Sequence, residues 1–146
     1  MKNISWNWKT LDEVANCEKS KKGKNYKAGS VLIPLSACIG SPLIQLTEPG
    51  TAEEKFYVAE PSDKILSNYL FLAISEEWER FKTAYIQNIN IRVEDIRHYR
   101  IKYCSIEDQE KVMNRLNAID GDIKREMEMM EKWKAVKKYL MYYMFP

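Results

Sequence analysis

Short apolar runs separated by turn-forming residues dominate the first sixty residues of the chain. VLIPL within Tyr26 to Leu35, SPLIQLT and KFYVAE are rich in β-branched or aromatic residues, which is typical of strands. The proline inside VLIPL predicts an edge strand or a strand end, because proline cannot donate to a ladder. The earlier segment LDEVANCEK predicts a short helix or turn.

A helical period begins near residue 62. Ile65, Tyr69 and Leu72 recur at helical spacing and are followed by the largely apolar stretch up to Trp78, with Ser62 as the expected N-cap. Beyond this helix AYIQNINIRV alternates and predicts a strand. VEDI then predicts a one-turn connector, and RHYRIKY predicts a last short strand.

The final segment predicts one long helix from about residue 106 to 144. Ser105 and Asp108 have the spacing of a capping box at its start, and lysines gather near its end, where they complement the helix dipole. The spacing of its apolar positions lies between the ~3.5 residues of a heptad seam and the ~3.6 of an ordinary amphipathic helix. These positions are Val112, Leu116, Ile119, Ile123, Met127, Met130, Trp133, Val136, Leu140 and Met144.

Such a helix is too long to pack only on its own domain. About 40 residues make a rod of roughly 60 Å, whereas a domain of ~100 residues has a radius of gyration of about 13 Å. Part of the apolar stripe therefore needs another helix. Gly121 predicts a kink, a close approach of a partner backbone, or a break into two helices. The fold class expected is α+β: a strand-rich mixed domain over residues 1–104, then a long helix over 105–146.

Composition argues against several kinds of site. The 146 residues are 45% hydrophobic and 30% charged, as in a folded, soluble protein. Cys17, Cys38 and Cys104 are too scattered for a metal knuckle or a disulfide framework, and one histidine, His98, argues against a histidine-ligated metal or a Ser-His-Asp triad. We expect no catalytic residues, no metal and no cofactor. Without a signal peptide or an apolar stretch of membrane-spanning length, a cytoplasmic location is expected.

The net charge of +2 does not by itself indicate a nucleic-acid-binding protein, but the lysines are clustered. The five lysines of this cluster fall within nine residues that contain no acid: Lys19, Lys21, Lys22, Lys24 and Lys27. Such a run is either a solvated loop or a means of holding phosphates without reading sequence. The pattern leaves both interpretations open.

The end of the chain resembles one target-recognition half of a Type I restriction–modification specificity subunit. SIEDQ at 105–109 is similar to that family's Pro-Leu-x-x-Gln helix start, and LNAID at 116–120 to its Leu-x-x-Ile-Asp register. VKKYL at 136–140, continuing to Phe145, is similar to the helix finish. WKTLDEVA, the basic loop, YKAGSVLIP and SDKILSNYLFLAI follow the family's order of elements. Cys104-Ser105 replaces the proline, the recognition portion is short, and the chain holds one half where the family has two.

The resemblance implies a non-catalytic DNA-recognition protein. In the family, two long helices pack antiparallel and hold two recognition domains apart, so that a bipartite target is read, while modification subunits dock and methylate. The expected partners are therefore double-stranded DNA, modification (methyltransferase) subunits and a second copy of this chain. A homodimer would form through an isologous helix contact, for which we select Val112, Leu116, Ile119, Ile123, Met127, Met130, Trp133 and Leu140.

The resemblance also favours two DNA-contacting segments. The five clustered lysines become candidate phosphate contacts, with Tyr26 able to position the loop or to stack. Gln87, Asn88, Asn90 and Arg92 are candidate base readers, since amides pair with adenine and arginine with guanine. Turn hydrogen bonding or simple solvation remains an alternative for each. The rival functions are a non-DNA interaction module that assembles through the long helix, and a small enzyme whose site the sequence does not reveal.

Overall fold

The computed structural model describes residues 4–145 and divides into two compact units. The first unit ends at Glu110 and the second begins at Lys111. The division expected after residue 104 separates the strand-rich domain from the whole of the long helix. In the structure, the first turn of this helix belongs to the first unit. Each unit is described by itself.

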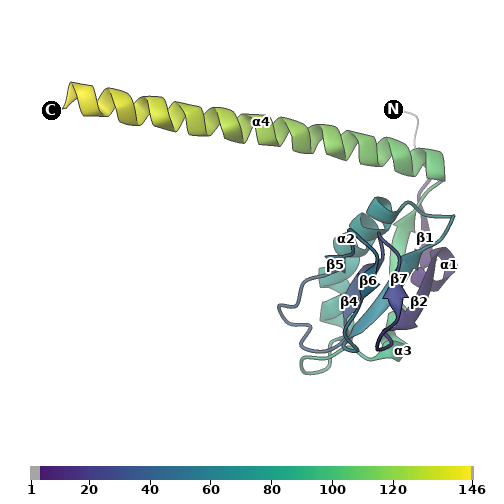
Figure 1. The fold of residues 1–146 in the computed structure, drawn as a ribbon. Coiled ribbons are helices and arrows are strands. Elements are labelled where there is room, and N and C mark those ends of the chain that lie inside the picture. Colours follow the sequence, from purple (N-terminus) through teal and green to yellow (C-terminus); the bar gives the residue numbers. More distant parts are fainter. Residues whose placement is uncertain (1–3, 146) are drawn as a thin grey trace. The chain divides into compact units, whose positions relative to one another are not determined.

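The first unit is built around a four-stranded antiparallel sheet with the order β2-β7-β4-β5 (Figure 1). Its strands are β2 (Ala15–Lys19), β4 (Val31–Pro34), β5 (Ile44–Gln45) and β7 (Phe56–Pro61). Every residue of β4 is buried, and β4 pairs with β5 on one side and β7 on the other. Pro34 is the last residue of β4, opposite Phe56. The strand-end prediction is therefore confirmed, and β4 is not an edge strand.

Two smaller antiparallel pairs complete the strands. β1 (Asn7–Thr10) pairs with β8 (Arg100–Tyr103), and β3 (Asn25–Tyr26) pairs with β6 (Gly50–Thr51). The segment expected to be a short helix or turn contains a single helical turn, α1 (Leu11–Val14), and then becomes strand β2. Glu13 closes the N-terminus of α1 by accepting the backbone amide and the hydroxyl of Thr10, at 2.7 and 3.0 Å.

The internal helix α2 (Ser67–Tyr85) buries one apolar face. It lies against β8, where the Tyr69 hydroxyl donates to the carbonyl of Lys102 at 3.0 Å. The buried Tyr99 hydroxyl donates to the carbonyl of Ile74 at 2.6 Å. The helix N-cap is Leu66 and not Ser62, because the Ser62 hydroxyl instead donates to the carbonyl of Val14 at 2.5 Å and accepts the amide of Lys64.

The strand expected over AYIQNINIRV does not form. Helix α2 continues to Tyr85, and residues 87–90 make a tight turn closed by two backbone hydrogen bonds between Gln87 and Asn90, at 2.9 and 3.1 Å. Asn88 has a φ of +60°, a left-handed conformation that asparagine tolerates better than most residues. The alternation of apolar residues therefore reflects a turn whose flanks are buried, not an extended strand.

The remaining elements confirm their predictions. VEDI is the one-turn helix α3 (Val93–Ile96), and RHYRIKY contains β8. The second unit is almost entirely α4 (Ile106–Met144), which is continuous through Gly121. At its start the amide of Asp108 donates to the Ser105 hydroxyl at 3.3 Å, as the capping-box spacing predicts. Among the helices of residues 4–145, none is both long and apolar enough to cross a membrane.

Candidate nucleic-acid interface

The five clustered lysines lie between the last residue of β2 and the residue after β3, a segment that we call the lysine loop (residues 19–27). The loop turns at Gly23, whose φ of +77° suits glycine, and the amide of Lys24 donates to the carbonyl of Lys21 at 3.1 Å. All five lysines are exposed. A compact turn thus gathers their charges at one edge of the sheet.

Glu18, the residue before the loop, partly neutralises it. The Lys21 ammonium lies 2.8 Å from its carboxylate, and the Lys24 ammonium donates to the same carboxylate. These two donors lower the pKa of Glu18 to about 2, so the carboxylate is charged at neutral pH. Glu18 is adjacent to the lysine loop in the sequence. Its pairing with Lys21 and Lys24 depends on the turn of the folded loop and is not visible in the sequence.

Tyr26 is a core residue and does not serve as a stacking platform. Its side chain is 1% exposed and packs with Leu32, Phe56 and Val58, so the prediction that it could stack on a base is wrong. Its hydroxyl accepts the amide of Lys21 at 2.9 Å. This hydrogen bond ties the lysine loop to the core at Lys21.

The second candidate segment is the turn formed by residues 87–92, which we call the amide turn. Arg92 donates from Nε and Nη2 to Oε1 of Gln87, at 3.1 and 2.6 Å. Oδ1 of Asn90 accepts the amide of Ala37 at 3.1 Å. Both amide oxygens are thus engaged within the protein, and the exposed side chains offer their NH₂ groups as donors.

The structure brings one end of the lysine loop together with the amide turn. Backbone bonds hold the amide turn against the segment after β4: the Cys38 amide donates to the Ile89 carbonyl at 2.7 Å, and the Ile91 amide to the Leu35 carbonyl at 2.9 Å. The result is a hollow of about 290 Å³. Its polar lining is Lys19, Ser36, Glu54, Asn90, Arg92 and Glu94.

Not every candidate residue reaches this hollow. Lys21, Lys22, Lys24, Lys27, Gln87 and Asn88 are outside its lining, although all are exposed. The carboxylates of Glu54 and Glu94 were not among the candidates. They place acceptors beside the donors of Lys19 and Arg92, and a carboxylate in a DNA groove accepts from the amino group of cytosine. No sequence spacing indicates this pairing, because the lining comes from four separate segments.

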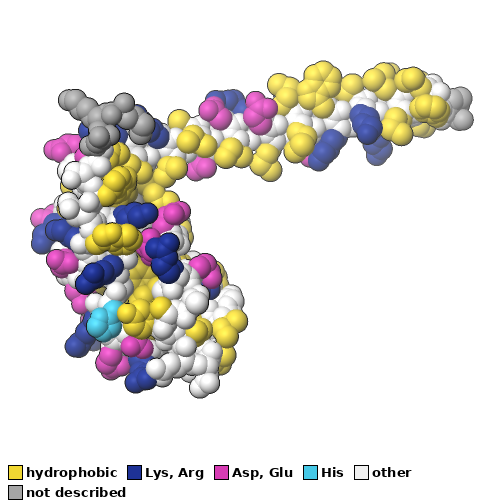
Figure 2. All heavy atoms as spheres, turned by 180° about the vertical axis from the view of Figure 1, so that it is seen from behind, with side chains coloured by type: hydrophobic (Ala, Val, Ile, Leu, Met, Phe, Trp, Pro, Cys, Tyr) yellow, Lys and Arg dark blue, Asp and Glu magenta, His cyan; other side chains and the backbone are white. Residues whose placement is uncertain are grey.

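The apolar stripe of α4 is exposed along most of its length. Val112 and Leu116 are partly covered, but Ile123, Met130 and Trp133 are 52%, 50% and 65% exposed. The other candidate dimerisation residues Ile119, Met127 and Leu140 are about half exposed. Figure 2 shows hydrophobic side chains covering much of the C-terminal part of this helix. These exposed side chains give α4 a large apolar surface.

The cysteines and His98 are the other chemical groups that the sequence singled out. Burial raises the pKa of the Cys38 and Cys104 thiols, and burial near Asp12 raises that of Cys17. His98 stacks on Tyr85, with ring centroids 5.9 Å apart. Within residues 4–145, no group of three His, Cys, Asp or Glu side chains is placed to hold a metal ion.

Comparison with known proteins gives matches among solved structures and among protein families. No curated protein matches the sequence. Three solved structures share the fold. The first is an S subunit of a Type I restriction–modification system from M. genitalium, with a TM-score of 0.68 and 15% identity. The others are a structure from work on assembly and conformational transition of the type I R-M system (TM-score 0.70, 16% identity) and the HsdS subunit from Thermoanaerobacter tengcongensis (TM-score 0.62, 15% identity).

These alignments cover 86%, 92% and 82% of this chain but only 41%, 43% and 38% of the three others, so the chain spans about two fifths of their length. The sequence itself matches a protein family over residues 4–129, which include residues 4–110 of the first unit and more than half of α4. The chain belongs to the Type I restriction modification DNA specificity domain family.

Proposed function

We propose that this chain is a half-size specificity subunit that recognises DNA for a Type I restriction–modification complex. The observation that carries the proposal is the family match over residues 4–129. The alignments cover about two fifths of the related solved structures. In this proposal the first unit reads one half of a target. The chain itself is not an enzyme, because specificity components of this family are non-catalytic, and modification subunits supply the methylation.

Two kinds of DNA contact follow from the surface described above. The lysine loop holds phosphates, which contributes affinity without sequence preference. The amide turn and the adjoining hollow read base edges: the NH₂ groups of Gln87 and Asn90 are donors, and Glu54 and Glu94 are acceptors. Arg92 donates to Gln87 in the free protein and so is held in a fixed orientation. This separation of positioning from reading is usual at protein–DNA interfaces.

In this proposal a second copy provides the partner for the apolar stripe of α4, as the antiparallel helix that the family resemblance implies. With Glu128, the midpoint of the stripe, on the two-fold axis, Lys134 of one helix lies opposite Asp122 of the other. Lys134 and Asp122 also form pairs within their own helix, with Glu131 and Arg125. The same register places Lys124 opposite Lys132 and Glu128 opposite its own copy, so charge does not decide the orientation. An isologous contact of this kind closes into a dimer.

The dimer would present two recognition units for one bipartite target. A two-fold axis favours a palindromic sequence, with half-sites near one turn of DNA apart, about 34 Å. Pairing with another specificity half in place of a second copy would make the target asymmetric. The complex would act in the cytoplasm, where the modification subunits meet DNA.

The alternative function is a protein-interaction module that does not bind DNA. The net charge of only +2 and the pairing of Glu18 with two loop lysines favour it. Electrophoretic mobility shift of duplex DNA at 50 to 200 mM salt separates the two functions. The proposal predicts binding that weakens steeply with salt. Absence of binding at low salt, with and without the modification subunit, would leave the interaction module as the function.

A further inference from the structure

A second surface of the first unit combines exposed cations with a tryptophan. β1 pairs with β8 so that Trp8 lies opposite Lys102 and Thr10 lies opposite Arg100. Residues that lie opposite each other, or two apart along one strand, share a face of the pair, so Trp8, Arg100 and Lys102 point to the same side. All three are exposed, and the Lys102 ammonium lies 5.8 Å from the centre of the Trp8 ring. We call these three residues the tryptophan face.

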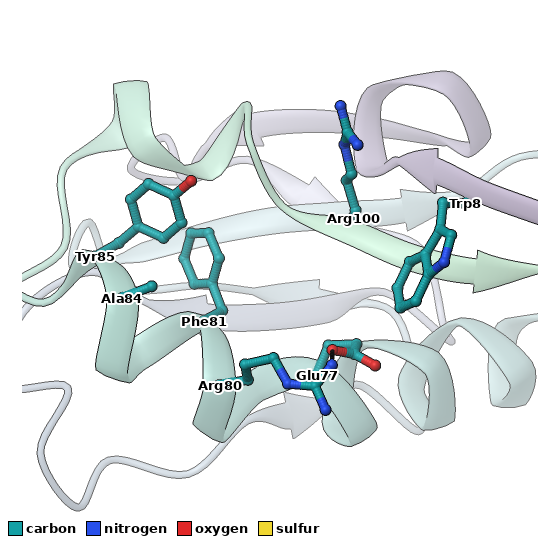
Figure 3. Close-up of a pocket in the computed structure, with 7 residues that line it drawn as sticks. All are labelled: Trp8, Glu77, Arg80, Phe81, Ala84, Tyr85 and Arg100. Atoms are coloured by element: carbon teal, nitrogen blue, oxygen red, sulfur yellow. Dashed lines mark hydrogen bonds and ion pairs between the residues drawn. The ribbon is translucent and has the colours of Figure 1, made fainter.

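The tryptophan face borders a recess with aromatic walls (Figure 3). The Trp8 ring forms one wall, and Phe81 and Tyr85 of α2 form the other. The volume of about 360 Å³ lies within the range of roughly 300 to 1,000 Å³ that is typical of small-ligand sites. The recess therefore has room for a planar ring, and its walls offer aromatic faces on which that ring can stack.

The wall on α2 is held in place by further aromatic packing. The Phe81 ring is buried, and its centroid lies 4.6 Å from that of Tyr85 and 4.3 Å from that of Tyr99. Tyr99 is itself fixed by the hydrogen bond from its hydroxyl to the carbonyl of Ile74. A wall that is already ordered loses little side-chain entropy when a ligand stacks on it.

The charges around the recess favour a ligand that carries phosphates. Arg80 and Arg100 line the recess, and Lys102 adjoins it. The Glu77 carboxylate also lines it, but Arg80 binds this carboxylate at 2.9 Å, and the Glu77 side chain is only 11% exposed. Glu13, which lies near Arg100, accepts two hydrogen bonds at the N-terminus of α1. Both carboxylates are thus engaged, whereas Arg100 and Lys102 are exposed.

We infer that the recess takes one unpaired base of a single-stranded DNA segment, while Arg100 and Lys102 hold the phosphates beside it. Bases inside a duplex stack on one another, so only an unpaired base offers its ring to the aromatic walls. Aromatic side chains on which bases stack, beside cations that follow the backbone, are the usual means of binding single strands.

The spacing of the cations favours a strand over a free nucleotide. Arg100 and Lys102 are two residues apart along β8, about 7 Å at ~3.4 Å per residue, so each can hold a different phosphate. This single-strand site is additional to the recognition of duplex DNA by the lysine loop and the amide turn. The inference therefore does not rest on the proposed function.

Binding of a labelled oligothymidine strand of about 12 nucleotides, followed by fluorescence anisotropy, tests the inference. Trp8→Ala should weaken binding at least about fivefold, whereas Trp8→Phe, which keeps an aromatic ring, should retain most of it. Trp133→Ala, at an exposed tryptophan of α4, is the matched control and should bind as the native chain does. Absence of binding to the strand, or equal losses in Trp8→Ala and Trp133→Ala, would overturn the inference.

An abasic strand of the same length separates stacking from phosphate binding. The native chain should bind it at least about fivefold more weakly than oligothymidine, and Trp8→Ala should bind the two strands equally. Arg100→Ala with Lys102→Ala should reduce the log–log salt slope by roughly 1.4, since each phosphate contact on a single strand contributes about 0.7. Equal binding of both strands by the native chain would refute the base site. Thymidine monophosphate that binds as tightly as the strand would contradict a strand as the occupant.

Duplex binding distinguishes failure of this inference from failure of the proposed function. Trp8→Ala should leave the affinity for duplex DNA unchanged, because the lysine loop and the amide turn do not include Trp8. Loss of duplex binding in Trp8→Ala would assign the tryptophan face to the duplex and contradict the single-strand site. Duplex binding without any single-strand binding would leave the proposed function intact and overturn the inference alone.

Discussion

The side chain of Gln109 joins the start of α4 to the start of α2 by accepting the amide of Leu66 at 2.9 Å. Its NH₂ group donates to the carbonyls of Cys104 and Lys64, at 2.9 and 3.3 Å, and the side chain is fully buried. Leu66 is the N-cap of α2, so one glutamine holds three backbone groups where two helices begin. The last residue of the SIEDQ motif is therefore the structural anchor of the long helix.

Replacing this glutamine should destabilise the first unit. Gln109→Ala leaves three backbone groups without their partner, and we expect the free energy of unfolding to fall by about 2 to 4 kcal/mol. Urea denaturation measures the change. Gln45→Ala is the control, because Gln45 is only half-buried and its side chain donates to Ser67 and Asn68 near the surface. Its cost should stay below about 1 kcal/mol, and equal costs would contradict the anchoring role.

Two glycines with similar backbone conformations provide a matched test of packing. Gly29 (φ +85°) and Gly23 (φ +77°) both lie in the left-handed region, but a Cβ at Gly29 would lie 2.5 Å from Cβ of Ser67, whereas a Cβ at Gly23 meets nothing within 4 Å. Gly23→Ala should cost about 1 kcal/mol, and Gly29→Ala at least about 2 kcal/mol more. Thermal unfolding measures both variants. Equal losses would show that the loop at Gly29 moves aside freely.

The lysine loop should control the salt dependence of DNA binding. Charge reversal of Lys21, Lys22 and Lys24 should weaken binding and reduce the log–log salt slope by about 2 to 3, since each phosphate contact contributes about 0.9. Fluorescence anisotropy of labelled duplex DNA measures the slope. Reversal of Lys124, Lys132 and Lys137 on α4 is the charge-matched control. Unchanged binding after reversal of the loop lysines would exclude the loop as a contact.

Glu18→Gln provides the opposite change at the same loop. Removing the carboxylate that holds Lys21 and Lys24 should strengthen DNA binding several-fold at low salt. The same pairing sets a pH dependence. Because the pKa of Glu18 is lowered from 4.5 to about 2, its contribution to loop order is present above pH 4.5 and is lost as the pH falls towards 2. Weaker DNA binding by Glu18→Gln would contradict the proposed neutralising role.

The long helix was the most predictable part of the fold, and the site the least. Its apolar period is sustained over 33 residues, and its N-terminal cap is formed by residues that are neighbours in the sequence. The first and last residues of the helix can therefore be predicted from the sequence alone. The strand expected at residues 84–93 failed because backbone bonds from Cys38 and to Leu35, both distant in sequence, hold a turn there. Tyr26 looked available for stacking only because sequence does not show that its ring lies in the core.

Polar replacement along the helix stripe tests the dimer. Leu116→Gln, Ile123→Gln and Met130→Gln together should shift the solution mass from dimer towards monomer, because they remove apolar contact from the seam. Light scattering over a range of concentrations measures the shift. Met129→Gln and Asn117→Gln, which lie off the stripe, should leave the mass unchanged. A native chain that is monomeric at high concentration would show that α4 pairs with a different protein.

Selection of binding sites from random duplex DNA tests the central claim most directly. The chain is incubated with the modification subunits, and the bound duplexes are recovered and sequenced. The account predicts enrichment of one bipartite, palindromic motif with half-sites about one turn of DNA apart, and loss of that motif when Gln87, Asn90 and Arg92 are replaced by alanine. Recovery of duplexes with no shared sequence would contradict the claim that this chain reads DNA.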